Sequence, residues 1–109
     1  MSPELKAEWI AVLRSGKYRQ GQAALRTKSD EYCCLGVLCN IVDPAGWRSS
    51  FSSALRNFRY DDDPDVSGIP GDAMLRHVGL DVRLAHDLAA MNDAGKSFFA
   101  ISEAIDQRA

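Results

Sequence analysis

The stretch Tyr32-Cys33-Cys34-Leu35-Gly36-Val37-Leu38-Cys39 combines all three cysteines of the chain with apolar residues and an isolated glycine. The apolar spacing that continues from it predicts a helix over residues 34–43. Asp43-Pro44 ends this helix, because the residue before a proline is disfavoured in the helical region. A glycine inside a helix weakens it, so Gly36 indicates close packing against another backbone.

The three cysteines are predicted to be buried thiols that pack as small apolar side chains. Because their number is odd and no secretory signal is seen, free thiols in a reducing compartment are expected. Structural zinc sites usually use closely spaced ligand pairs, which Cys33, Cys34 and Cys39 do not form with His77 or His86. A metal site on these cysteines and a thiol nucleophile with a histidine base remain as alternatives.

The composition predicts one globular domain over residues 1–109. The 13 basic and 15 acidic residues give a net charge of −2, so no general attraction to phosphate backbones is expected. No stretch approaches the ~20 apolar residues of a membrane-spanning helix. We therefore expect a cytoplasmic protein that does not associate with membranes.

The regular elements on either side of the cysteine stretch are mostly helical. Residues 2–15 predict an amphipathic helix, with Ser2 as its N-cap and Pro3 at the first helical position. Residues 23–33 predict an antiparallel hairpin, with strands at 23–27 and 31–33. Residues 72–108 predict further helices, capped by Asp81 and Ser97. The fold class is therefore α+β, a helix-dominated single domain with a small antiparallel β-hairpin.

Residues 44–71 are predicted to form an irregular acidic insertion that includes a short helix over 52–58. Its aspartates do not match a calcium-binding loop, because Val66 and Asp72 stand where the pattern needs a glycine and a glutamate. The same carboxylates form a local negative patch able to meet a basic surface on a partner, beside an aromatic anchor. The contact residues predicted on this basis are Tyr60, Asp61, Asp62, Asp63 and Asp65.

Residues 88–101 contain two weak motif matches. Gly95-Lys96-Ser97 ends like a phosphate-binding P-loop, but position 90 is alanine and the preceding segment is helical, so a helical corner is expected. Residues 88–101 also partly match the first helix and turn of a DNA-binding helix-turn-helix unit. The helix that follows carries Glu103 and Asp106 against Arg108 and is not basic, so direct sequence-specific DNA binding is not expected.

Two blocks of the chain carry a family resemblance. The first runs from Trp9 to Gly21 and continues with Leu25-Arg26 and residues 32–39; the second comprises Leu88-Ala89, Asn92-Asp93, Gly95, Ser97-Phe98 and Ile101. Together they resemble small proteins encoded by bacteriophages and prophages, largely without assigned function. The resemblance covers the first 43 residues well and residues 79–106 more loosely. It implies a phage accessory protein acting inside a bacterium, and it carries no catalytic residues with it.

The function expected from these observations is macromolecular binding without catalysis and without a cofactor. The expected partner is a host protein or ribonucleoprotein, and inhibition of a defence system such as a CRISPR complex fits the phage context. The alternatives are a domain that binds a small ligand (a nucleotide) or a metal, with a pocket between hairpin and helices, and a cysteine-dependent enzyme. Trp47 and Phe51 mark either a homodimer surface or core positions.

Overall fold

The structure, a computed structural model, describes residues 1–27, 29–49, 55–58 and 69–109. In these residues the helices are α1 (Pro3–Arg14), α2 (Cys34–Val42), α3 (Asp72–Val78), α4 (Val82–Asp93) and α5 (Phe98–Arg108). The strands are β1 (Arg19–Gln20), β2 (Arg26–Thr27), β3 (Glu31–Tyr32), β4 (Trp47–Ser49) and β5 (Leu55–Phe58). The helix-dominated α+β class is therefore confirmed.

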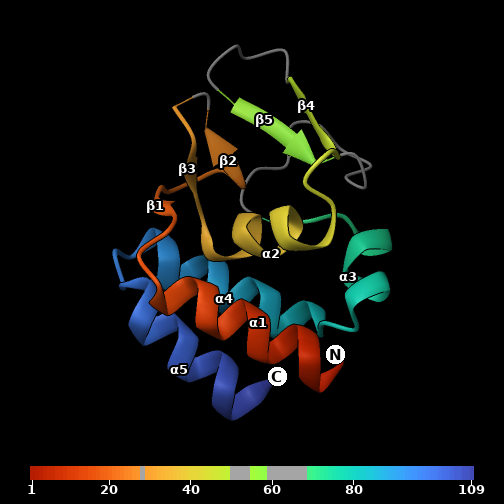
Figure 1. Ribbon diagram of the computed structural model, residues 1–109, viewed down its shortest axis with the longest axis vertical. Coiled ribbons are helices and arrows are strands. Elements are labelled where there is room, and N and C mark those ends of the chain that lie inside the picture. Colours follow the sequence, from red (N-terminus) through yellow and green to blue (C-terminus); the bar gives the residue numbers. More distant parts are fainter. Residues whose placement is uncertain (28, 50–54, 59–68) are drawn as a thin grey trace.

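The elements form layers, and α2 is the central one. Figure 1 shows α2 between the small sheet on one side and the group of α1, α4 and α5 on the other, with α3 at the edge. The two termini lie near each other (Figure 1). Near them, the Lys6 ammonium of α1 donates to the Ala109 carbonyl at 2.9 Å. No helix in the described part of the chain is long and apolar enough to cross a membrane.

The sheet is small and mixed, with the strand order β1-β3-β2-β5-β4. Strands β2 and β3 pair antiparallel with Arg26 opposite Tyr32, which confirms the predicted hairpin. Strand β1 adds to β3 in parallel, a pairing that the sequence did not reveal. Asp30 adopts a φ of 59° in the hairpin turn, a left-handed conformation that aspartate tolerates.

Three predicted boundaries are corrected. The strand expected from Ala23 begins only at Arg26, because Ala23 takes a left-handed φ of 65° that interrupts extended backbone. The short helix expected over 52–58 is wrong at Leu55–Phe58, which pairs with β2 and β4 as strand β5. Strand β4 likewise replaces irregular structure at its position. Pairing with neighbouring strands satisfies the backbone hydrogen-bonding groups of these short segments. Hydrophobic periodicity does not distinguish strand from helix over so few residues.

The helix ends agree with their sequence signals. The Ser2 hydroxyl accepts a hydrogen bond from Leu5 N at 3.2 Å at the start of α1. The Asp81 carboxylate accepts from Arg83 N at 2.7 Å, and Ser97 accepts from Ala100 N at 3.1 Å. These side chains satisfy backbone donors that have no partner inside the helix. The predicted C-terminal helices are therefore confirmed.

Candidate functional site

All three thiols lie in the core. Cys33, Cys34 and Cys39 are not in disulfide bonds and are at most 1% exposed. Cys33 caps α2, since its sulfur accepts a hydrogen bond from Gly36 N at 3.3 Å, and the Cys34 thiol donates to the Leu88 carbonyl at 3.6 Å. The prediction that the cysteines fill the interior is confirmed.

Burial also suppresses the chemistry of these thiols. It raises the pKa of Cys33 from 9.0 to about 11 and the pKa of Cys34 well above its ordinary value. Both groups therefore stay protonated near neutral pH, whereas zinc ligation and nucleophilic attack need a thiolate. The imidazoles of His77 and His86 are exposed, in contrast to the enclosed thiols. Within the described ranges, no three His, Cys, Asp or Glu side chains are grouped so that they could hold a metal ion.

Asn92, at the end of α4, is a polar side chain that is 0% exposed and makes several hydrogen bonds. Its Oδ1 accepts hydrogen bonds from Cys34 N at 3.2 Å and from Gln20 Nε2 at 3.0 Å. Its Nδ2 donates to the Gly21 carbonyl at 2.7 Å. One amide thus joins β1, the start of α2 and the end of α4, and its hydrogen bonds offset the cost of burying this polar side chain.

Polar contacts continue through the corner between α4 and α5 (residues 92–97). Gln20 Nε2 also donates to the Lys96 carbonyl at 2.7 Å, and the Asp93 carboxylate accepts from Ala23 N at 2.9 Å. The second contact accompanies the left-handed conformation of Ala23. The segment from Arg19 to Ala23 is therefore held to the corner by hydrogen bonds, while its outer side faces solvent.

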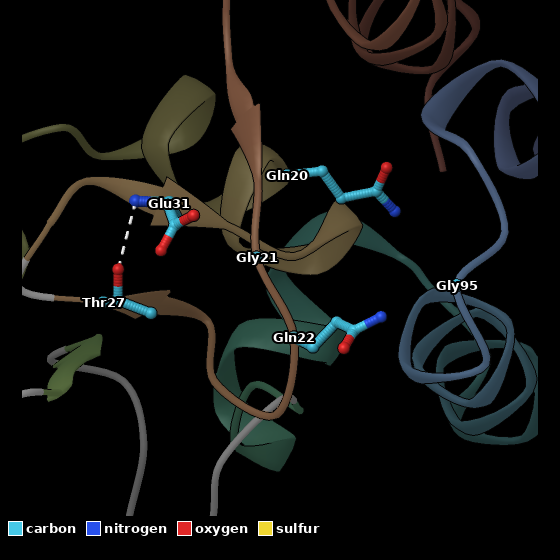
Figure 2. A pocket seen from close by; sticks show the side chains of 6 residues that line it. All are labelled: Gln20, Gly21, Gln22, Thr27, Glu31 and Gly95. Carbon is cyan, nitrogen blue, oxygen red and sulfur yellow. Dashed lines mark hydrogen bonds between the residues drawn. The ribbon is translucent and has the colours of Figure 1, made fainter.

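A polar pocket of about 370 Å³ opens where this segment, the hairpin and the corner meet. Figure 2 shows the side chains of Gln20 and Gln22 on the side of Gly21 that faces the corner, and those of Thr27 and Glu31 on the other side. The sixth lining residue, Gly95, belongs to the corner itself. The position between hairpin and helices is the one expected for a ligand-binding domain, but these lining residues carry no sequence motif and were not predicted.

A partly buried aromatic cluster occupies the face of the sheet nearest the end of α2. The Arg26 guanidinium lies 5.1 Å from the Tyr32 ring centroid and 5.3 Å from that of Trp47. Tyr18 packs edge-on against Tyr32 at 4.8 Å, and the Asn40 amide links the Tyr18 hydroxyl to the Trp47 indole nitrogen. Trp47 therefore packs within the domain, although it stays half-exposed; Phe51 lies outside the described residues.

A second arginine–aromatic pair lies on the helical side of the domain. Phe99 on α5 is 57% exposed, and the Arg14 guanidinium of α1 lies 5.1 Å from its ring centroid. Arg14 Nε also donates to the Ser102 hydroxyl at 2.8 Å, which fixes the guanidinium over the ring. No local pattern in the sequence indicates this pair, because it forms only when α1 packs against α5.

The chain matches the model of a protein family, the Domain of unknown function (DUF8296), over residues 1–109. The chain belongs to the DUF8296 family. No curated protein matches the chain, and no solved structure does. Membership agrees with the predicted resemblance to proteins without assigned function, and the DUF8296 assignment adds no activity, ligand or source to it.

The contact residues predicted for this DUF8296 domain in the acidic stretch remain predictions. Tyr60 and the aspartates at 61–63 and 65 lie outside the described residues.

Gly95-Lys96-Ser97 forms the expected helical corner, with Gly95 at a φ of 86° and Ser97 capping α5. The helix preceding it replaces the strand that a P-loop requires.

Proposed function

We propose that this protein acts by binding another macromolecule. The observation that carries the proposal is the exposed Arg14–Phe99 pair, because aromatic and arginine side chains are enriched at protein interfaces. An isolated exposed apolar residue needs no explanation in a soluble protein. Phe99 differs because a guanidinium is stacked on its ring and is itself anchored by a buried hydroxyl, that of Ser102.

The rigidity of the pair supports a role in binding. Arg14 and Phe99 project from two helices that pack along each other, and Ser102 also donates to the Phe99 carbonyl at 2.6 Å. Side chains that are ordered before a partner arrives lose less conformational entropy on binding. A cation–π contact also strengthens when a partner excludes water from it.

The partner we propose is a host protein or ribonucleoprotein, and the context we propose is phage or prophage. The support for the context is the resemblance of residues 1–43 to small phage proteins. Inhibition of a defence system such as a CRISPR complex is the corresponding activity. In this proposal Tyr60 and the adjacent aspartates form a second contact, toward a basic surface.

The experiment is affinity capture from a bacterial lysate, followed by identification of the captured protein and measurement with both partners purified. Phe99→Ala should weaken the purified complex by roughly thirtyfold, as expected for a residue that dominates an interface. Val82→Ala is the matched control, because Val82 is also an exposed apolar residue, at 47%, but lies at the start of α4. Equal affinity of wild type and Phe99→Ala would contradict the proposed contact.

The predicted acidic contact has its own arm in this experiment. A variant with Asp61, Asp62, Asp63 and Asp65 all changed to asparagine should bind more weakly, and the loss should shrink as salt is added. Equal recovery of the same partner by this variant and the wild type would remove the acidic contact and leave the Arg14–Phe99 contact in place.

A further inference from the structure

The pocket beside Gly21 offers an unusual set of hydrogen-bonding groups. Gln20 Nε2 already donates to Asn92 Oδ1 and to the Lys96 carbonyl, at 3.0 and 2.7 Å. Two acceptors at one end of the amide identify that end as the nitrogen and use both of its hydrogens. The Gln20 Oε1 atom is then the group left for a ligand, and no donor from the described residues reaches it.

The other lining side chains add acceptors and a negative charge. Gln22 is exposed and its Nε2 donates to the Asn92 carbonyl at 3.5 Å, which again leaves an amide oxygen. The Glu31 carboxylate is 40% exposed and lies 3.8 Å from the Arg19 guanidinium, which is itself 70% exposed. That separation exceeds a hydrogen bond and both groups are hydrated, so the ion pair is weak and readily exchanged.

The charge of the lining selects the class of ligand. The pocket is lined by Gln20, Gly21, Gln22, Thr27, Glu31 and Gly95, so none of its lining side chains is a lysine or arginine. A phosphate or nucleotide would be repelled by Glu31, and the nearby Arg19 guanidinium is 70% exposed and does not line the pocket, so phosphate binding is disfavoured. A cation that donates several hydrogen bonds would be attracted by Glu31 and by the amide oxygens together.

We propose that this pocket receives the guanidinium of an arginine side chain on the partner macromolecule. Arginine suits it because its planar group carries five donors for the amide oxygens and a permanent positive charge that complements Glu31. Glu31 supplies the charge, and the oxygens of Gln20 and Gln22 accept from the remaining N–H groups. The inference rests on the proposed function, because it names the partner group that enters the pocket.

The test uses the full chain and a probe that isolates charge from shape. Isotope-labelled protein is titrated with N-acetyl-arginine amide and, in parallel, with N-acetyl-citrulline amide, which has nearly the same shape and no charge. Saturable NMR shift changes are expected at Gly21 and at the side-chain amides of Gln20 and Gln22 with arginine. Citrulline should bind roughly tenfold more weakly, since a charge-assisted hydrogen bond becomes a neutral one.

Two variants assign the effect to Glu31. Glu31→Gln keeps the shape of the pocket and should weaken arginine binding roughly tenfold. Glu103→Gln is the control, since Glu103 is also an exposed glutamate but belongs to α5 and does not line the pocket. Equal responses to arginine and citrulline, no response at the highest soluble concentration, or full binding by Glu31→Gln would overturn the proposal.

The arginine pocket and the proposed function can each fail without the other. A purified partner that binds wild type and Glu31→Gln equally, with no arginine response, removes the arginine pocket and leaves macromolecular binding standing. Arginine binding in the labelled protein without any reproducible partner retains the pocket and removes the proposed function.

Discussion

Helix α2 and the segment from Arg19 to Ala23 are held in the domain by opposite kinds of interaction. Every residue from Cys34 to Cys39 is buried, and the helix is fixed mainly by apolar packing between two layers. The Arg19–Ala23 segment is fixed mainly by hydrogen bonds to Asn92, Asp93 and Lys96. The reactive side chains are thus withdrawn from solvent, and chemically modest glutamines line the accessible pocket. The most reactive residue types of this chain are therefore not the ones that line its accessible pocket.

The largest expected effect lies at the close contact between Gly36 of α2 and the backbone of Leu25, the residue before β2. A Cβ atom at Gly36 would lie 1.7 Å from the Leu25 carbonyl oxygen, so Gly36→Ala must push two backbones apart. We expect a loss of about 3 kcal/mol or more in the free energy of unfolding, measured by urea denaturation. Gly16→Ala is the control: Gly16 has a φ of 76° and no atom within 4 Å, so only about 1 kcal/mol of conformational strain is expected. Equal losses would show that packing at Gly36 is not what matters.

The next largest loss of stability is expected at the polar junction formed by Asn92. Asn92→Ala leaves Cys34 N and the Gly21 carbonyl without their partner inside the protein, and we expect a loss of about 2–3 kcal/mol. The matched change is Gln22→Ala, which removes one long hydrogen bond at an exposed position and should alter stability by less than ~0.5 kcal/mol. If the unfolding curves of the two variants coincide, the Arg19–Ala23 segment does not depend on the hydrogen bonds of Asn92.

Much of this fold follows from local sequence signals, and the failures share one cause. Ser2, Asp81 and Ser97 cap helices as predicted, because a cap depends only on residues within one turn. Gly36 packs against a backbone as predicted, since an isolated glycine in an apolar helix has few other uses. The parallel β1–β3 pairing and strand β5 depend on neighbours far along the chain, which periodicity in short segments does not report.

The candidate site was less predictable than the fold. Asn92 falls four residues after Leu88 on the buried stripe of α4, and an amide on an apolar face is a signal that a buried junction exists. The sequence contains no comparable signal for the pocket, because Gln20, Gln22 and Glu31 are ordinary surface residue types. The Arg14–Phe99 pair depends on the packing of α1 on α5, which the two helices do not specify separately.

A smaller effect concerns the buried thiols and pH. The folded state raises the pKa of Cys33 from 9.0 to about 11, so it keeps its proton at pH values where the unfolded chain has lost it. The stabilisation from this group is complete below pH 9 and is lost as the pH rises toward 11. Between pH 8 and pH 10 the expected loss is about 1 kcal/mol, and Cys34 contributes in the same direction.

The control for this titration is Cys33→Ser, which retains an acceptor for Gly36 N at the helix cap but has no thiol. Its stability should decline less between pH 8 and pH 10 than that of the wild type, by the share that Cys33 supplies. Parallel declines in the two proteins would show that Cys33 is not the titrating group.

At Phe99 we expect a small effect on stability and the largest effect on binding. Its ring is 57% exposed and contacts the Arg14 guanidinium, so Phe99→Ala should lower the free energy of unfolding by no more than about 1 kcal/mol. Gly36→Ala should instead reduce binding only in proportion to the unfolded fraction that it creates, because α2 is enclosed. Stability and affinity measured on both variants therefore separate the buried core from the binding surface. A Phe99→Ala protein that loses stability as Gly36→Ala does would place Phe99 in the core's cooperative packing and remove the ground for treating it as a contact residue.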